Sequence, residues 1–137
     1  MLADLKMTKY QSVLLIEDDE VDVLNVKRAF RKKGFHQALH LAENGVDAIH
    51  KLSEWKGEHE ALPDLILLDL NMPKMGGFEF LRAISQIESL SDIDVYVMST
   101  SAAETDIQLA RDLGAVGYVI KPLYTDRFAD ELEKILA

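Results

Sequence analysis

The fold of this chain is decided by residues 65–73, which read LILLDLNMP. Four consecutive large aliphatic residues are typical of a strand that is buried on both faces of a parallel sheet. Asp69 ends this run, and open α/β sheets place their ligands at the carboxyl ends of the strands. Asp69 is therefore the first candidate site residue.

Two other apolar runs also end in charged residues. Residues 13–16, VLLI, lead into Glu17 and Asp18, and residues 117–120, GYVI, lead into Lys121. Because the carboxyl ends of neighbouring parallel strands lie at one edge of the sheet, we expect these side chains to converge with the aspartate of the first run.

Length and composition limit the classes of protein that this chain can belong to. With 137 residues, 48% of them hydrophobic, the chain is long enough for one well-packed domain and short for two. A net charge of -9 argues against direct nucleic-acid binding, because binding to the phosphate backbone requires a basic surface. The chain has no cysteine, which excludes disulfides and thiolate metal sites, and no apolar run of roughly 18 residues that would cross a membrane. We expect a soluble, cytoplasmic protein rather than a membrane or DNA-binding protein.

From residue 12 onward, apolar runs alternate with amphipathic stretches. The predicted strands are residues 13–16, 38–42, 65–69, 94–98 and 117–120, and the predicted helices are residues 20–33, 45–55, 77–88, 103–113 and 126–136. Five strand–helix repeats favour an α/β fold of the flavodoxin-like, doubly wound type, with a five-stranded parallel sheet of order 2-1-3-4-5 and helices on both faces. The predicted domain spans residues 12–137, after a loosely held N-terminal arm at residues 1–11.

Local signals support this division. Ser101 and Glu104 have the spacing of a helix capping box, and Gly34 and Gly114 follow helical patterns as C-terminal stops. The long connection at residues 53–63 has two interpretations, a solvated loop or a partner-specific surface with an exposed Trp55 as its anchor.

The predicted cluster of Glu17, Asp18 and Asp69 requires a counter-ion. Two unit charges about 4 Å apart repel by roughly 4 kcal/mol at an effective dielectric near 20. Carboxylate and carbonyl oxygens are hard ligands, so Mg²⁺ is the preferred ion, with Mn²⁺ or Ca²⁺ as substitutes. Lys121 supplies a second positive charge, and Ser99 is the first of three hydroxyl residues after the fourth predicted strand. This set is suited to holding a phosphoryl group on Asp69 as the nucleophile.

Each of these residues alone has a structural explanation. The acidic pair complements a helix dipole, Asp69 caps a loop, Lys121 is a solvated cation, and Ser99 belongs to a turn. Their conjunction at the ends of four predicted strands favours the functional interpretation.

These residues together resemble the receiver domain of two-component response regulators, over roughly residues 12–136. The residues that carry the resemblance are Glu17, Asp18, Asp69, Ser99, Lys121 and Pro122. The long second connection resembles that of stand-alone receivers associated with phytochrome-type kinases.

The resemblance implies a role for each matching position. Asp69 would be the phosphoacceptor, assisted by Lys121 and Ser99. Asp18 and Asp69 would bind Mg²⁺ directly, Asn71 through its backbone carbonyl, and Glu17 through water. Ser99 and Tyr118 would form the switch, Asn71 and Ser101 would tune the lifetime of the phosphoryl group, and Gly77 would permit a tight turn. The Lys121–Pro122 peptide bond is expected to be cis.

The resemblance also implies a signalling protein that is not an enzyme beyond its own phosphorylation and dephosphorylation. Its expected donor is a sensor histidine kinase or a histidine phosphotransfer protein. Its expected output is either contact with a downstream protein or an effector domain that this sequence does not include. The expected output face lies around Thr100, Tyr118 and residues 102–113. The sequence leaves open whether the protein forms a homodimer.

Two rival functions belong to other classes. A phosphohydrolase that works through an aspartyl phosphate would need a second aspartate where Asn71 stands. A binding module that never meets phosphate would have no use for the complete set of acidic, hydroxyl and lysine residues.

Overall fold

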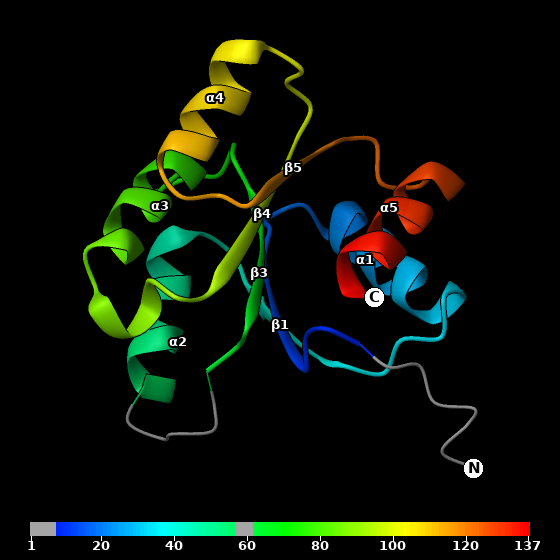
Figure 1. The fold of residues 1–137 in the computed structure, drawn as a ribbon, viewed down its shortest axis with the longest axis horizontal. Helices are drawn as coiled ribbons and strands as arrows, with labels where there is room; N and C mark the ends of the chain where they lie inside the picture. The colour runs from blue at the N-terminus through cyan, green and yellow to red at the C-terminus, as the bar shows by residue number, and fades with distance from the viewer. Residues whose placement is uncertain (1–7, 57–61) are drawn as a thin grey trace.

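The computed structural model describes residues 8–56 and 62–137, and its centre is a five-stranded parallel sheet (Figure 1). The strands are β1 (Ser12–Ile16), β2 (Ala38–Ala42), β3 (Leu65–Asp69), β4 (Asp94–Ser99) and β5 (Gly117–Ile120). Their spatial order is β2-β1-β3-β4-β5, which confirms the predicted doubly wound sheet. The strand β3, which ends in Asp69, therefore lies at the centre.

Helices cover both faces of the sheet. They are α1 (Glu20–Lys32), α2 (Gly45–Lys56), α3 (Gly77–Ser85), the 3₁₀ turn η2 (Glu88–Leu90), α4 (Glu104–Asp112) and α5 (Asp126–Leu136). Figure 1 shows α1 and α5 on one face, with α2, α3 and α4 on the other. Among residues 8–56 and 62–137, no helix combines the length and apolar character needed to cross a membrane.

The alternating side chains of β3 explain why its sequence is apolar throughout. Leu65 and Leu67 pack into the core beneath α1 and α5, whereas Ile66 and Leu68 pack into the core beneath α2 and α3. All four are almost fully buried, and each burial contributes about 1.5–3 kcal/mol to stability. A strand buried on both faces is a rigid support for the residue that ends it.

Two local predictions about helix ends are wrong. The predicted helix 77–88 ends at Ser85, because Ile87 adopts an extended conformation and turns its side chain into the core. Ser101 is not the N-cap of α4, since Ala103 holds that position without a side-chain cap. The Ser101 hydroxyl instead donates to Asp106 at 2.6 Å and accepts from the Ala103 amide at 3.2 Å. The predicted glycine stops are confirmed, with φ of 73° at Gly34 and 106° at Gly114.

Trp55 does not form the exposed anchor that one interpretation required. Its ring is half-buried on α2 and lies 5.0 Å from the ring of His40 on β2, centroid to centroid. The rest of that connection includes residues 57–61, which lie outside the described residues.

The packed part of the chain includes the end of the predicted N-terminal arm. Tyr10 is buried and its hydroxyl donates to Asp94 at 2.5 Å, while the Lys9 amide donates to the carbonyl of Leu136 at 2.8 Å. The remainder of the predicted arm, residues 1–7, lies outside the described residues.

Candidate functional site

Three carboxylates meet where β1 and β3 end. Ile16 pairs with Leu68 in the parallel ladder, so the next residues, Glu17 and Asp69, fall side by side. Asp18 joins them, and one carboxylate oxygen from each of the three lies within 4.8 Å of the other two. Glu17 and Asp69 are buried, whereas Asp18 is exposed. The structure thus brings the predicted acidic residues together.

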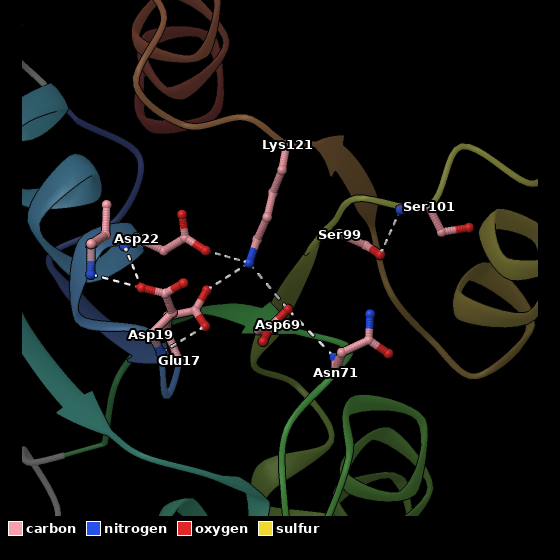
Figure 2. Close-up of polar contacts among 9 residues, drawn as sticks. Glu17, Asp19, Asp22, Asp69, Asn71, Ser99, Ser101 and Lys121 are labelled. Carbon is pink, nitrogen blue, oxygen red and sulfur yellow. Dashed lines mark hydrogen bonds and ion pairs between the residues drawn. The ribbon is translucent and has the colours of Figure 1, made fainter.

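Lys121 reaches this cluster from the end of β5, the edge strand that β4 separates from β3. The Lys121 amide donates to the carbonyl of Ser99 at 2.8 Å, which continues the β4–β5 ladder and fixes the start of the lysine side chain. The Lys121 ammonium then contacts Glu17 at 3.0 Å and Asp69 at 3.3 Å (Figure 2). The following peptide bond, Lys121–Pro122, is cis, as the resemblance implied.

The electrostatics of the cluster reflect one cation among several anions. Burial raises the pKa of Glu17 to about 8, and the nearby Asp69 charge adds to the shift against the opposing effect of Lys121. Burial also works against the Lys121 charge, but its carboxylate partners, Asp22 and Glu17, outweigh this and raise the lysine pKa. Lys121 is therefore a permanent cation, and the raised pKa of Glu17 means that its carboxyl group holds a proton to higher pH than an exposed glutamate does.

The Asp69 carboxylate is hydrogen-bonded through one of its two oxygens. Asp69 Oδ1 accepts from Lys121 Nζ and, over a long 3.4 Å, from the Asn71 amide. Within the described residues, no hydrogen bond ends on Asp69 Oδ2, which leaves one oxygen able to act as a nucleophile. The Asn71 side chain is exposed at the rim.

The turn that follows Asp69 has room only for glycine at position 77. A Cβ atom on Gly77 would lie 2.8 Å from the Asp69 carbonyl oxygen and 2.8 Å from Leu70 Cα. The Gly77 amide also donates to the Leu70 carbonyl at 3.0 Å, so the start of α3 packs directly on the backbone of residues 69–70. Gly77 therefore holds the position that the resemblance assigned to it.

The predicted switch and lifetime residues form a second cluster, on the α4 side of the site. Ser99 is buried and its hydroxyl accepts from the Ser101 amide at 3.0 Å. The Tyr118 hydroxyl donates to the Ser101 carbonyl at 2.9 Å. Ser101 in turn donates to Asp106, so this cluster connects the end of β4 to both β5 and α4. Figure 2 shows Ser99 on the far side of Asp69 from Glu17.

Sequence reasoning missed Asp22, which makes the shortest contact of the lysine. Lys121 Nζ lies 2.6 Å from Asp22 Oδ2. An acidic residue in the first turn of a helix has an ordinary explanation, because it complements the helix dipole. A signal was nevertheless present: Asp22 precedes the buried residues Asn25, Val26 and Ala29 by three, four and seven positions, so it lies on the inward face of α1.

The acidic cluster fits a hard divalent cation. An octahedral ion with metal–oxygen distances of about 2.1 Å holds neighbouring ligands about 3 Å apart and opposite ligands about 4.2 Å apart. The oxygens of Glu17, Asp18 and Asp69, all within 4.8 Å of one another, need only a small closure to reach these separations. The set contains only oxygen donors, which favours Mg²⁺ or Mn²⁺ over softer metals.

Comparison with known proteins identifies the family. The model of the response regulator receiver domain matches residues 13–133, and the chain belongs to this family. Receiver domains are the phosphoryl-accepting signalling domains of two-component systems. They bind a divalent metal in an acidic pocket, and they generally interact with histidine kinases and downstream targets.

The similar proteins include several response regulators. Response regulator Rcp1 of Synechocystis sp. is 35% identical over 111 residues, which cover 80% of this chain and 75% of Rcp1. Probable methanogenesis regulatory protein FilR2 of Methanothrix harundinacea is 33% identical over 123 residues, covering 90% of this chain and 79% of that protein.

Two solved structures show the same fold. The Mn²⁺-bound form of Rcp1 has a TM-score of 0.78 at 30% identity and covers 91% of both chains. The phosphorylated cyanobacterial phytochrome response regulator RcpA has a TM-score of 0.79 at 31% identity, with 92% of this chain and 91% of that chain covered. The similarity therefore spans the sheet and the site together.

Proposed function

We propose that Asp69 is the phosphoacceptor of this receiver domain, with Lys121 and Ser99 as its assisting groups. The observation that carries the proposal is the convergence of Lys121 Nζ on Asp69 Oδ1 beside two further carboxylates, at the carboxyl end of the central strand. The other carboxylate oxygen of Asp69, Oδ2, is the proposed nucleophile.

The transfer step requires little chemistry beyond positioning and charge. Asp69 Oδ2 attacks the phosphorus atom of a phosphohistidine, the new P–O bond forms as the P–N bond breaks, and the electron pair leaves with the imidazole, which takes a proton from water. Lys121 stays close to the acceptor and neutralises charge on the phosphoryl oxygens.

Mg²⁺ is the proposed cation of the acidic cluster, with Mn²⁺ as a substitute. Asp18 and Asp69 would bind it directly, the Asn71 carbonyl would complete the protein ligands, and Glu17 would act through water. When bound, the ion supplies positive charge to the phosphoryl oxygens. The pairing of the buried Glu17 carboxylate with Lys121 supports an outer position for Glu17.

The proposed switch starts at Ser99. Its hydroxyl now accepts from the Ser101 amide, and a phosphoryl group on Asp69 would offer the hydroxyl a charged acceptor instead. The Ser101 segment would then lose one of its restraints, and Tyr118, which bonds the Ser101 carbonyl, would be free to turn inward. The face around Thr100, Tyr118 and residues 102–113 would carry this change to a downstream protein. Ser101 and Asn71, at the rim, are the proposed tuners of the phosphoryl lifetime.

The donor is proposed to be a histidine kinase or a histidine phosphotransfer protein. The similarity to RcpA, described as a phytochrome response regulator, supports a kinase of the phytochrome-associated type. Phosphotransfer from a panel of purified kinases would test this, and faster transfer from kinases of other types would contradict it. The proposed receiver unit covers residues 12–137, after an arm at residues 1–11 whose last part, Lys9 and Tyr10, packs against this unit.

The experiment that tests the acceptor is intact-mass spectrometry after incubation with acetyl phosphate and Mg²⁺. We expect one added phosphoryl group on the wild-type protein and none on Asp69→Asn. Asp64→Asn is the matched control, because it removes the same charge at the start of β3 and should keep the adduct. Modification that persists in Asp69→Asn, or no adduct on the wild type with any donor, would overturn the proposal.

A further inference from the structure

Three carboxylates contact the ammonium group of Lys121, and the contact with the proposed acceptor, Asp69, is the longest. The distances from Lys121 Nζ are 2.6 Å to Asp22, 3.0 Å to Glu17 and 3.3 Å to Asp69. A lysine ammonium has three donor hydrogens, so these three contacts use its full capacity. Figure 2 shows Asp22 and Glu17 on the α1 side of the ammonium and Asp69 on the other side.

Asp22 holds its position firmly because the start of α1 is anchored. The Asp19 side chain caps the helix by accepting from the amides of Val21 and Asp22. The next inward-facing residues of α1, Asn25 and Val26, are buried against the sheet. The carboxylate of Asp22 is therefore presented to the lysine by a rigid element.

We propose that Asp22 is a positioning residue that competes with the phosphorylated acceptor for Lys121. It holds the lysine toward α1, and it thereby weakens the ion pair between Lys121 and the phosphoryl group. This inference rests on the proposed role of Asp69 and deepens it, because it assigns a residue that sets how strongly the phosphorylated state is stabilised.

Competition follows from the geometry. A phosphoryl group on Asp69 brings additional negative charge to the side of Lys121 that now has its longest contact. The ammonium must then move from Asp22 toward the phosphoryl oxygens or divide its hydrogen bonds between them, and charge-assisted bonds are sensitive to such lengthening. Removing the charge of Asp22 releases the lysine to the phosphoryl group.

Beryllofluoride, a stable mimic of the phosphoryl group, provides the test. We would measure its binding to the full chain at saturating Mg²⁺ by isothermal titration calorimetry. Asp22→Asn should bind it roughly 5- to 10-fold more tightly than wild type, as expected for loss of one competing charge-assisted hydrogen bond. Asp22→Glu, which restores the charge, should return the affinity toward the wild-type value.

Asp19→Asn is the matched control for general charge relief. It removes one negative charge from the same rim, and asparagine remains a good N-cap, so α1 should stay intact. We expect less than about a 2-fold change in this variant, because a solvent-exposed charge without the lysine contact is well screened. In a Lys121→Met background, Asp22→Asn should have no more effect than Asp19→Asn.

A direct readout in the metal-free protein separates positioning from stability. The ammonium resonance of Lys121 in ¹H–¹⁵N spectra should shift in Asp22→Asn and stay unchanged in Asp19→Asn. Equal effects of the two variants on binding, unchanged or weaker binding in Asp22→Asn, or persistence of the effect without Lys121 would each overturn the inference. If the wild type fails to bind beryllofluoride at all, the proposed acceptor falls, and the competition falls with it.

Discussion

Acidic side chains lie both where the strands begin, called here the amino edge of the sheet, and where the strands end, called the carboxyl edge. The two groups of carboxylates have different neighbours. At the amino edge, two carboxylates accept hydrogen bonds: Asp64 accepts from the amides of Gln11 and Ser12 at 2.9 and 3.0 Å, and Asp94 accepts from the Tyr10 hydroxyl. At the carboxyl edge, Glu17, Asp18 and Asp69 crowd together, and the same lysine serves two of them.

The difference shows which edge is built for stability and which for ligand binding. Carboxylates that accept hydrogen bonds from otherwise unpaired donors stabilise the native state. Carboxylates that crowd one another destabilise it, because the like charges are held together by the fold. The carboxyl edge therefore has a deficit of positive charge that a divalent cation would remove.

The largest expected effect comes from removing the cation of the carboxyl edge. Lys121→Met should lower the free energy of unfolding of the metal-free protein by about 3 kcal/mol, since it leaves buried carboxylates without their partner. Urea denaturation in EDTA would measure this. Asp22→Asn in the same background should recover part of the loss, and a fully stable Lys121→Met protein would contradict the contrast between the edges.

Magnesium should stabilise the protein through the carboxyl edge alone. At a concentration 100 times its Kd, a ligand that binds only the folded state adds about 2.7 kcal/mol to the free energy of unfolding. Asp64→Asn should retain this gain, while Asp69→Asn should lose most of it. Thermal denaturation with and without Mg²⁺ distinguishes the edges, and a gain of equal size in both variants would show that the cation binds elsewhere.

The metal-free protein should lose stability as pH rises from about 5 to 8. Burial raises the pKa of Glu17 to about 8 from an ordinary value near 4.5, so the folded state binds a proton that the unfolded state has released. This contribution is complete below the unfolded pKa and disappears as pH passes the folded pKa. Glu17→Gln should flatten the profile of urea midpoints against pH, and a slope that persists in this variant would assign the effect to another group.

The smallest expected effect on stability comes from a substitution at the amino edge. Tyr10→Phe removes the hydroxyl that donates to Asp94, and we expect a loss of about 1 kcal/mol. The loss should be the same with and without Mg²⁺, because Tyr10 and Asp94 lie at the far edge from the acidic cluster. Calorimetric unfolding measures it, and a Mg²⁺-dependent loss would mean that the two edges are coupled.

The central strand made the fold predictable from the sequence. Residues 65–68 alternate between two cores, so every position had to be apolar, and this pattern is visible without a structure. The helix ends were less predictable. The end of α3 depends on the packing of the Ile87 side chain against the core, which the local sequence does not show. Ser101 matched a capping motif, but its hydroxyl bonds Asp106 and the Ala103 amide instead.

The apolar runs of the sequence placed the charged site residues that end a strand or follow one closely. Glu17, Asp18, Asp69 and Lys121 are placed by strand register, which the apolar runs reveal. Asp22 lies one turn into a helix, and its contact with Lys121 depends on the rotation of α1 and on the reach of a lysine side chain. The sequence around Asp22 does not predict this contact. It therefore does not distinguish Asp22 from an acidic residue that only complements the helix dipole.

The most direct test of the contrast between the edges removes one charge from each end of β3. Urea denaturation of wild type, Asp69→Asn and Asp64→Asn would be compared in EDTA at pH 7.5. We expect Asp69→Asn to be more stable than wild type by about 1–3 kcal/mol, from relief of like-charge repulsion, and Asp64→Asn to be less stable by about 1 kcal/mol. Shifts of the same sign in both variants, or a loss of stability in Asp69→Asn, would contradict the account.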